Sequence, residues 1–163
     1  MKKTSKKTAK KTKHSARCEC ASCNDPVENE IWEAKQLSEH GFYIHVVSER
    51  DPQSPSGFNA HTHGMDRIGH PDFQITLPLQ SLDHVGAFFH EMCSRVKNGQ
   101  SFLHGDIIPD LLANGYLARL INATECGRPV LRIVFADKNN NVMPHDMSRN
   151  EAIAQYGYSR TSP

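Results

Sequence analysis

Two histidines separated by one residue, His61 and His63, are the first candidates for chemistry in this 163-residue sequence. Side chains two positions apart on a β-strand project from the same face, so both imidazoles would point the same way. A transition metal bound there needs a further ligand, and Asp66 and His70 follow shortly after. Further donors from other segments are His45, His104 and Asp106. No HExxH spacing fixes a third ligand, so the alternative is a polar strand face in a chain with ten histidines.

Three cysteines lie close together at Cys18, Cys20 and Cys23, with His14 just upstream. Three thiolates could bind zinc, with His14 or a residue from elsewhere in the chain completing a tetrahedral site, so these four residues are candidates for a zinc knuckle. Such a short segment leaves little loop to wrap around an ion. The alternative is a group of reduced cysteines without metal.

Nucleophilic catalysis has weaker support. Cys93 lies beside an apolar stripe and is expected to pack a helix. Cys126 lies in a predicted turn near Arg128, whose charge would lower the thiol pKa, but the sequence names no base for it. There is no G-x-S-x-G motif, P-loop or dinucleotide fingerprint. The catalytic residues are therefore unknown, and the sequence favours a protein that is not an enzyme.

The N-terminus differs sharply in charge from the rest of the chain. Residues 1–17 hold eight of the 19 lysines and arginines and none of the 18 acidic residues. Its cations are Lys2, Lys3, Lys6, Lys7, Lys10, Lys11, Lys13 and Arg17. Residues 2–13 repeat Lys-Lys-Thr three times at a period of four, and such a repeat without an apolar partner predicts a disordered tail. The tail would bind nucleic acid or another polyanion non-specifically, or else serve only to increase solubility.

Cysteine usage and hydropathy bear on the compartment. The five cysteines are odd in number, and neither an export signal nor a long apolar run occurs. A disulfide framework and a membrane span are thus not expected, and the prediction is a cytoplasmic location.

The candidate residues must be positioned by elements that the hydrophobic pattern predicts. A helix is expected between Asp25 and Gly41, and the clearest one covers about 82–97. The predicted strands cover 42–47, 58–63, 73–77, 116–123 and 130–136, with a helical turn near 109–113 and a short helix at 149–155. This order predicts an α+β fold with an antiparallel or mixed sheet packed by two main helices. The expected organisation is a lysine-rich tail with the cysteine cluster at 1–24, one domain at 25–156 and a flexible end at 157–163.

Several short motifs, each different from the others, lie at predicted turns and strand ends. They cover residues 20–23, 41–42, 60–65, 69–73, 96–99 and 131–137. Through them, from about residue 18 to 155, the chain resembles the bacterial domain-of-unknown-function 4262 family. The residues at that family's motif positions are Thr62, Gly64, Pro71 and Asp72. Thr62 and Gly64 match the family, whereas Asp72 stands where glutamate is usual and Met65 where leucine is usual. His61 replaces the usual tyrosine, so a metal pair at His61 and His63 would not be common to the family. The resemblance implies no activity, substrate or cofactor.

Local chemistry adds an expectation for the motif residues. Gly64 should occupy a turn that needs a positive φ or a close backbone approach. Thr62 and Asp72 carry polar groups that would hydrogen-bond the backbone of that turn.

Two classes of function follow. The first is a non-enzymatic binding or regulatory module, with an unknown protein or polyanion as partner. The second is a small metal-dependent hydrolase, with His61 and His63 as ligands and Asp66 or Asp106 as ligand or general base. No cofactor is certain, and zinc is the expected metal if one binds.

Overall fold

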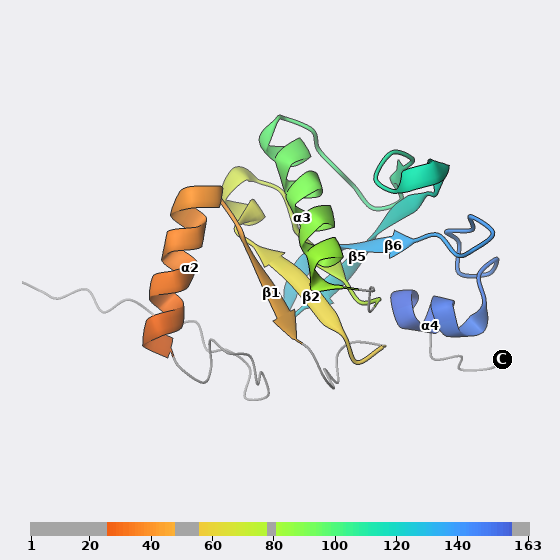
Figure 1. Ribbon diagram of the computed structural model, residues 1–163, viewed down its shortest axis with the longest axis horizontal. Helices are drawn as coiled ribbons and strands as arrows, with labels where there is room; N and C mark the ends of the chain where they lie inside the picture. The colour runs from red at the N-terminus through yellow and green to blue at the C-terminus, as the bar shows by residue number, and fades with distance from the viewer. Residues whose placement is uncertain (1–25, 48–55, 78–80, 158–163) are drawn as a thin grey trace, which may run out of the picture.

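The computed structural model describes residues 26–47, 56–77 and 81–157. The lysine-rich tail, the cysteine cluster and residues 158–163 lie outside the described residues. Within them, a six-stranded mixed sheet packs with helices, which confirms the predicted α+β fold (Figure 1). None of the helices in these ranges is long and apolar enough to cross a membrane.

The elements follow one another with short connections. The helices are α2 (Pro26–His40), α3 (Leu82–Lys97) and α4 (Arg149–Tyr156), with 3-10 turns η1 (Met65–Ile68) and η2 (Ala113–Gly115). The strands are β1 (Tyr43–Val47), β2 (Asn59–His63), β3 (Asp72–Ile75), β4 (Ile107–Ile108), β5 (Ala118–Glu125) and β6 (Arg128–Phe135). Their order in the sheet is β1-β2-β3-β6-β5-β4. Only the β3–β6 pair is parallel, and the other described pairs are antiparallel.

Helix α3 covers one face of the sheet (Figure 1). Its buried residues recur at helical spacing, and Ser81 caps its first turn by accepting a hydrogen bond from the His84 backbone. Phe89 on this helix and Phe73 on β3 belong to one buried apolar cluster and are completely buried. Cys93 lies in the same cluster, as the sequence predicted. This face therefore holds the main hydrophobic core.

The opposite face of the sheet is polar although much of it is buried. Ala60 on β2 belongs to the main core. Because strand residues alternate between faces, its neighbours Asn59 and His61 point to the opposite face. Gln74 on β3 and Arg132 on β6 lie in register with His61 and are also buried. This set of side chains is called the polar face below.

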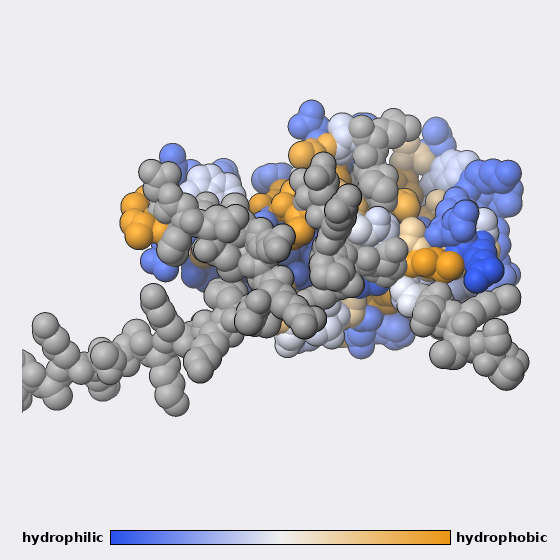
Figure 2. Space-filling view, turned by 90° about the horizontal axis from the view of Figure 1, so that it is seen from below, coloured by the Kyte–Doolittle hydropathy of each residue, from blue (hydrophilic) through white to orange (hydrophobic). Residues whose placement is uncertain are grey.

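Helices α2 and α4 lie at opposite ends of the molecule (Figure 1). Helix α4 packs Ala152 with Ile121 and Val134 in a second, smaller apolar cluster. Helix α2 has the predicted period, but Val27 and Ile31 are 66% and 68% exposed. Figure 2 shows apolar side chains at the surface where α2 lies. The helical spacing thus predicted the element without predicting which side is buried.

Some boundaries differ from the sequence prediction. The hairpin between β5 and β6 has a two-residue turn at Cys126 and Gly127, both with positive φ, so Pro129 belongs to the strand. Pro129 is tolerated because pairing between β3 and β6 begins only at Val130. The short strand β4 was not predicted because two residues carry no periodicity.

Gly64 connects β2 to η1, and its backbone confirms the predicted need for glycine. Its φ is +117°, and an added Cβ would lie 2.7 Å from the Gly41 carbonyl oxygen and from Leu37 Cδ2. Thr62 Oγ1 donates to Asp72 Oδ1 at 3.0 Å, and Asp72 Oδ1 also accepts from the Met65 backbone N–H at 3.2 Å. Asp72 thus bonds the backbone of the turn as expected, whereas Thr62 bonds the Asp72 side chain and accepts from the Phe73 backbone on β3.

We predict that Gly64→Ala lowers the free energy of unfolding by about 2 kcal/mol or more, because strain in φ adds to a backbone clash. Gly69→Ala is the matched control: φ there is +78°, but nothing lies within 4 Å of the added carbon. Strain alone should cost it roughly 1 kcal/mol. Urea denaturation measures both, and equal losses would show that the close approach at Gly64 has no energetic weight.

Candidate functional site

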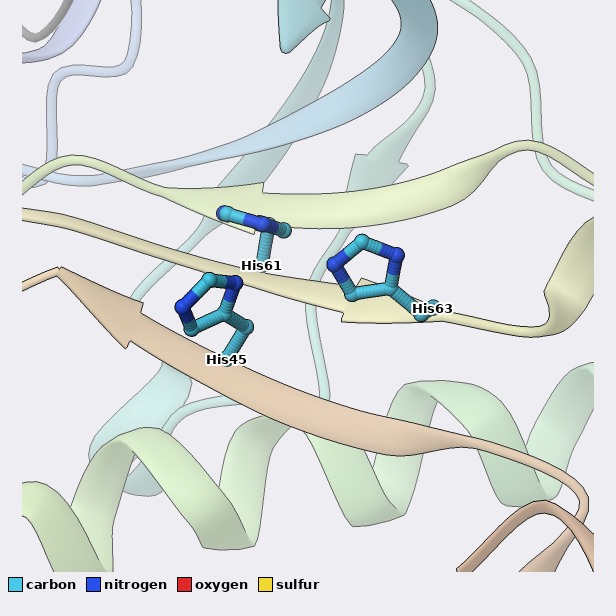
Figure 3. A group of neighbouring side chains, drawn as sticks. All are labelled: His45, His61 and His63. Carbon is cyan, nitrogen blue, oxygen red and sulfur yellow. The ribbon is translucent and has the colours of Figure 1, made fainter. Parts of the chain in front are cut away.

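Three imidazoles gather on the polar face. His45, His61 and His63 each offer a ring nitrogen, and these three atoms all lie within 4.8 Å of one another. The ring centroids of His45 and His61 are 5.0 Å apart, and those of His61 and His63 are 4.9 Å apart. Figure 3 shows the three rings grouped over the two neighbouring strands. They form the metal-capable group in the part of the chain that the structure describes, and it is called the histidine cluster below.

The register of two strands produces the histidine cluster. In the antiparallel β1–β2 ladder, His45 lies directly opposite His61, and Tyr43 lies opposite His63. Side chains opposite each other on one face have Cβ atoms about 5 Å apart, so their rings must meet. His63 follows His61 by two residues and thus shares its face, as predicted. The cluster therefore needs no special loop, only this register.

Aromatic packing covers the outer side of the histidine cluster. The Tyr43 ring stacks on His63 with centroids 4.6 Å apart, and Trp32 of α2 meets Tyr43 edge-on at 5.7 Å. Burial, followed by the charge of Glu33 and a hydrogen bond with it, raises the pKa of Tyr43 above its ordinary value. Its hydroxyl is therefore protonated at neutral pH.

A buried carboxylate lies behind His61. Glu125 Oε2 accepts hydrogen bonds from Asn59 Nδ2 at 2.6 Å and from Gln74 Nε2 at 2.8 Å. The Cys126 thiol donates to Oε1 at 3.4 Å, and His61 Nδ1 is 3.8 Å from that oxygen. Within the described residues, the side chains that donate to Glu125 are thus neutral.

The network continues to the C-terminal helix. Arg132 Nε donates to Gln74 Oε1 at 2.8 Å, and its Nη1 donates to the backbone oxygen of Gln155 on α4 at 3.0 Å. The Gln155 side chain in turn bonds both backbone groups of Phe135. These bonds fix the position of Gln74 and, through it, of Glu125.

His61 and His45 are neutral at pH 7. Burial is the main cause that lowers the pKa of His61 to about 2, and the positive charges that His63, His45 and Arg128 can carry lower it further. Burial also lowers the pKa of His45, although Glu33 and Glu125 partly oppose this. The 3.8 Å contact of His61 with Glu125 is therefore not an ion pair. Neutral imidazole is the form that binds metals.

The structure brings together some of the predicted ligands but not others. His45 joins His61 and His63, whereas Asp66 and His70 are not part of the histidine cluster. Asp66 is exposed on η1, and both ring nitrogens of His70 bond the backbone, at Pro71 and Phe102. His104 and Asp106, the other predicted metal ligands, each accept a hydrogen bond from the backbone. The donor to His104 is Asn122, and the donor to Asp106 is Leu103. The knuckle residues His14, Cys18, Cys20 and Cys23 lie outside the described residues.

The remaining cysteines do not form a catalytic pair. Burial raises the pKa of Cys93 to about 12, so its thiol stays protonated. Cys126 is exposed in the β5–β6 turn, where its thiol faces Glu125. Sequence analysis missed Glu125, because a glutamate at a strand end gives no signal of burial.

Comparisons with known proteins find no match for this chain among protein-family models, curated proteins or solved structures.

We predict that the metal-free protein loses stability with acid partly through His61. Its pKa is about 2 when folded and about 6.5 when unfolded, so the unfolded chain binds more protons between these values. Stability should fall as pH drops below about 6.5, by up to about 1.4 kcal/mol per pH unit for this ring. His61→Gln should flatten that slope in urea titrations with chelator present.

The exposed His84 provides a matched control, and His84→Gln should keep the slope of the unchanged protein. If His61→Gln and the unchanged protein lose stability equally between pH 6 and 4.5, His61 is not held neutral in the fold.

Proposed function

We propose that this protein is a metal-binding module that holds one divalent transition ion through His45, His61 and His63. The observation that carries the proposal is the convergence of three ring nitrogens within 4.8 Å on adjacent strands. Imidazole suits Zn²⁺, Cu²⁺, Ni²⁺ and Fe²⁺, and zinc is the first candidate. The use of three histidines fits a site of this class.

The geometry needs only a modest adjustment. Zinc–nitrogen bonds of about 2.0–2.1 Å in a tetrahedron place the nitrogens about 3.3 Å apart. The ring nitrogens would thus approach one another by up to about 1.5 Å on binding. Rotation of the half-buried His45 and His63 about their side-chain bonds can supply this movement without a change in the strands.

The electrostatics favour a cation. Glu125 is a buried carboxylate whose described hydrogen-bond donors are neutral, and it lies 3.8 Å from the His61 ring. A buried carboxylate is destabilising without positive charge nearby, and the buried Arg132 guanidinium, which bonds the same Gln74 side chain, supplies part of that charge. An ion on the far nitrogen of His61 would add further positive charge, while Asn59 Oδ1, 3.4 Å from Nδ1, holds the ring orientation.

Three protein ligands leave one coordination position for water or another ligand. A binding or regulatory role is the function preferred here, because neither Asp66 nor Asp106 is close enough to belong to the cluster. Hydrolysis by a metal-bound water is the second candidate, favoured by the open position alone. The lysine-rich tail, with nucleic acid as a candidate partner, the cytoplasmic location and the family resemblance are separate proposals that the metal site does not require.

We predict one Zn²⁺ per chain in tag-free protein by native mass spectrometry, in a full-length chain with Cys18, Cys20 and Cys23 replaced by serine. This background removes the predicted knuckle, so that bound zinc reports on the histidine cluster. The double variant His45→Ala/His61→Ala should lose the ion while keeping its circular dichroism spectrum. Zinc at 100 times its Kd should raise the free energy of unfolding of the chain with an intact histidine cluster by about 2.7 kcal/mol.

The matched control for the double variant is His84→Ala/His145→Ala, which removes two exposed imidazoles outside the cluster. It should bind zinc normally. Zinc binding that survives in His45→Ala/His61→Ala, or no zinc in any variant, contradicts the proposal. Zinc that is lost only when the cysteines are replaced assigns the metal to the knuckle instead.

A second prediction concerns Glu125. Glu125→Gln keeps the size of the side chain but removes its charge, so zinc affinity should fall by about 10- to 100-fold. Competition with a fluorescent chelator measures the change. The comparison variant is Glu91→Gln, an exposed glutamate on α3 that pairs with Arg95, and it should bind zinc as the unchanged chain does.

A further inference from the structure

Arg128, the first residue of β6, has two terminal guanidinium nitrogens, and only one of them has a hydrogen-bond partner among the described residues. Its Nη1 donates to Asp72 Oδ2 at 2.9 Å, and Asp72 is almost completely buried. Its Nη2 is buried, yet no acceptor lies within hydrogen-bonding distance among the residues that the structure describes. A buried donor left unpaired costs about 1–3 kcal/mol, so Nη2 is placed to bond an acceptor that the protein does not itself supply.

The guanidinium lies beside the histidine cluster. Arg128 is opposite Glu125 in the β5–β6 ladder, and Glu125 reaches to 3.8 Å from the His61 ring. An acceptor at Nη2 would therefore lie on the same face of the sheet as an ion held by these rings.

We propose that the ion in the histidine cluster and Arg128 together bind a small monoanionic carboxylate. One carboxylate oxygen takes the coordination position that the three histidines leave open, and the other accepts from Arg128 Nη2. This inference rests on the proposed metal site and names the class of molecule that the site would recognise.

The choice of a carboxylate follows from geometry and charge. A planar carboxylate matches the planar guanidinium, which makes such pairs strong and directional. A divalent ion and Arg128 bring three positive charges, while Asp72 and Glu125 bring carboxylates close to the same place. A monoanion meets less repulsion from these two acidic side chains than a dianion such as phosphate does.

The test uses the full-length, tag-free chain with Cys18, Cys20 and Cys23 replaced by serine, loaded with Co²⁺ as a spectroscopic substitute for zinc. Acetate is titrated in a non-coordinating buffer while the visible absorption of Co²⁺ is followed. We expect a saturable spectral change, and a tenfold or greater loss of acetate affinity in Arg128→Gln. Inorganic phosphate should bind more weakly than acetate.

Two further variants make the result specific. Arg119→Gln removes a cation from the same face, on β5 near Tyr156, and should leave acetate binding unchanged. Arg128→Lys keeps the charge beside Asp72 but loses the second donor, so acetate binding should weaken there even if Arg128→Gln does not fold.

The outcomes separate the two proposals. If no Co²⁺ binds, the metal site itself fails and this inference fails with it. If Co²⁺ binds but acetate has no effect, or acts equally on Arg128→Gln, Arg128→Lys and the unchanged chain, only the inference is overturned. Tighter binding of phosphate than acetate would also overturn it, because the ligand would then not be a monoanionic carboxylate.

Discussion

The structure depends on the burial of polar side chains on one face of its sheet. Asn59, Gln74 and Glu125 are each at most 4% exposed, so they must bond one another in place of water. The amides of Asn59 and Gln74 both reach the same carboxylate oxygen, and Arg132 holds the other end of Gln74. Because these residues come from β2, β3, β5 and β6, a shift in register of any one strand would break several bonds at once. The histidine cluster takes its position from this arrangement.

The two faces of the sheet differ in composition: one holds the apolar core, and the other holds the polar residues and the histidine cluster. On the α3 side, Phe73 and Phe89 bury apolar surface and supply the driving force for folding. On the other face, burial of amides, a carboxylate and imidazoles lowers the net free energy of unfolding because these groups lose their contacts with water. Polar residues at core positions break the ordinary pattern of a folded domain, and such departures tend to gather at functional sites. The polar face is therefore where a function is best sought.

Sequence reasoning went furthest where the signal was local. Helix α3 was predicted from Leu82 to Lys97, as observed, because its apolar stripe and cap lie within one segment. The shared face of His61 and His63 followed from alternation along one strand, and the turn at Gly64 followed from its residue type. His45 was named only as one donor among several, because the pairing of β1 with β2 decides that it meets His61. Glu125 escaped notice, since its burial depends on partners 66 and 51 residues away in the sequence.

The charges on the polar face argue together for a cation held beside His61. Neutral rings at His61 and His45 remove the repulsion that protonated imidazoles would exert on an ion. Arg128 opposes an ion, but Nη1 of Arg128 bonds Asp72, whose carboxylate offsets much of its charge. Glu125 is bonded by neutral donors, and the buried Arg132, which bonds the same Gln74 side chain, offsets part of its charge. An ion at the histidine cluster would add positive charge near Glu125, and an anionic ligand on the ion would give Arg128 Nη2 its acceptor.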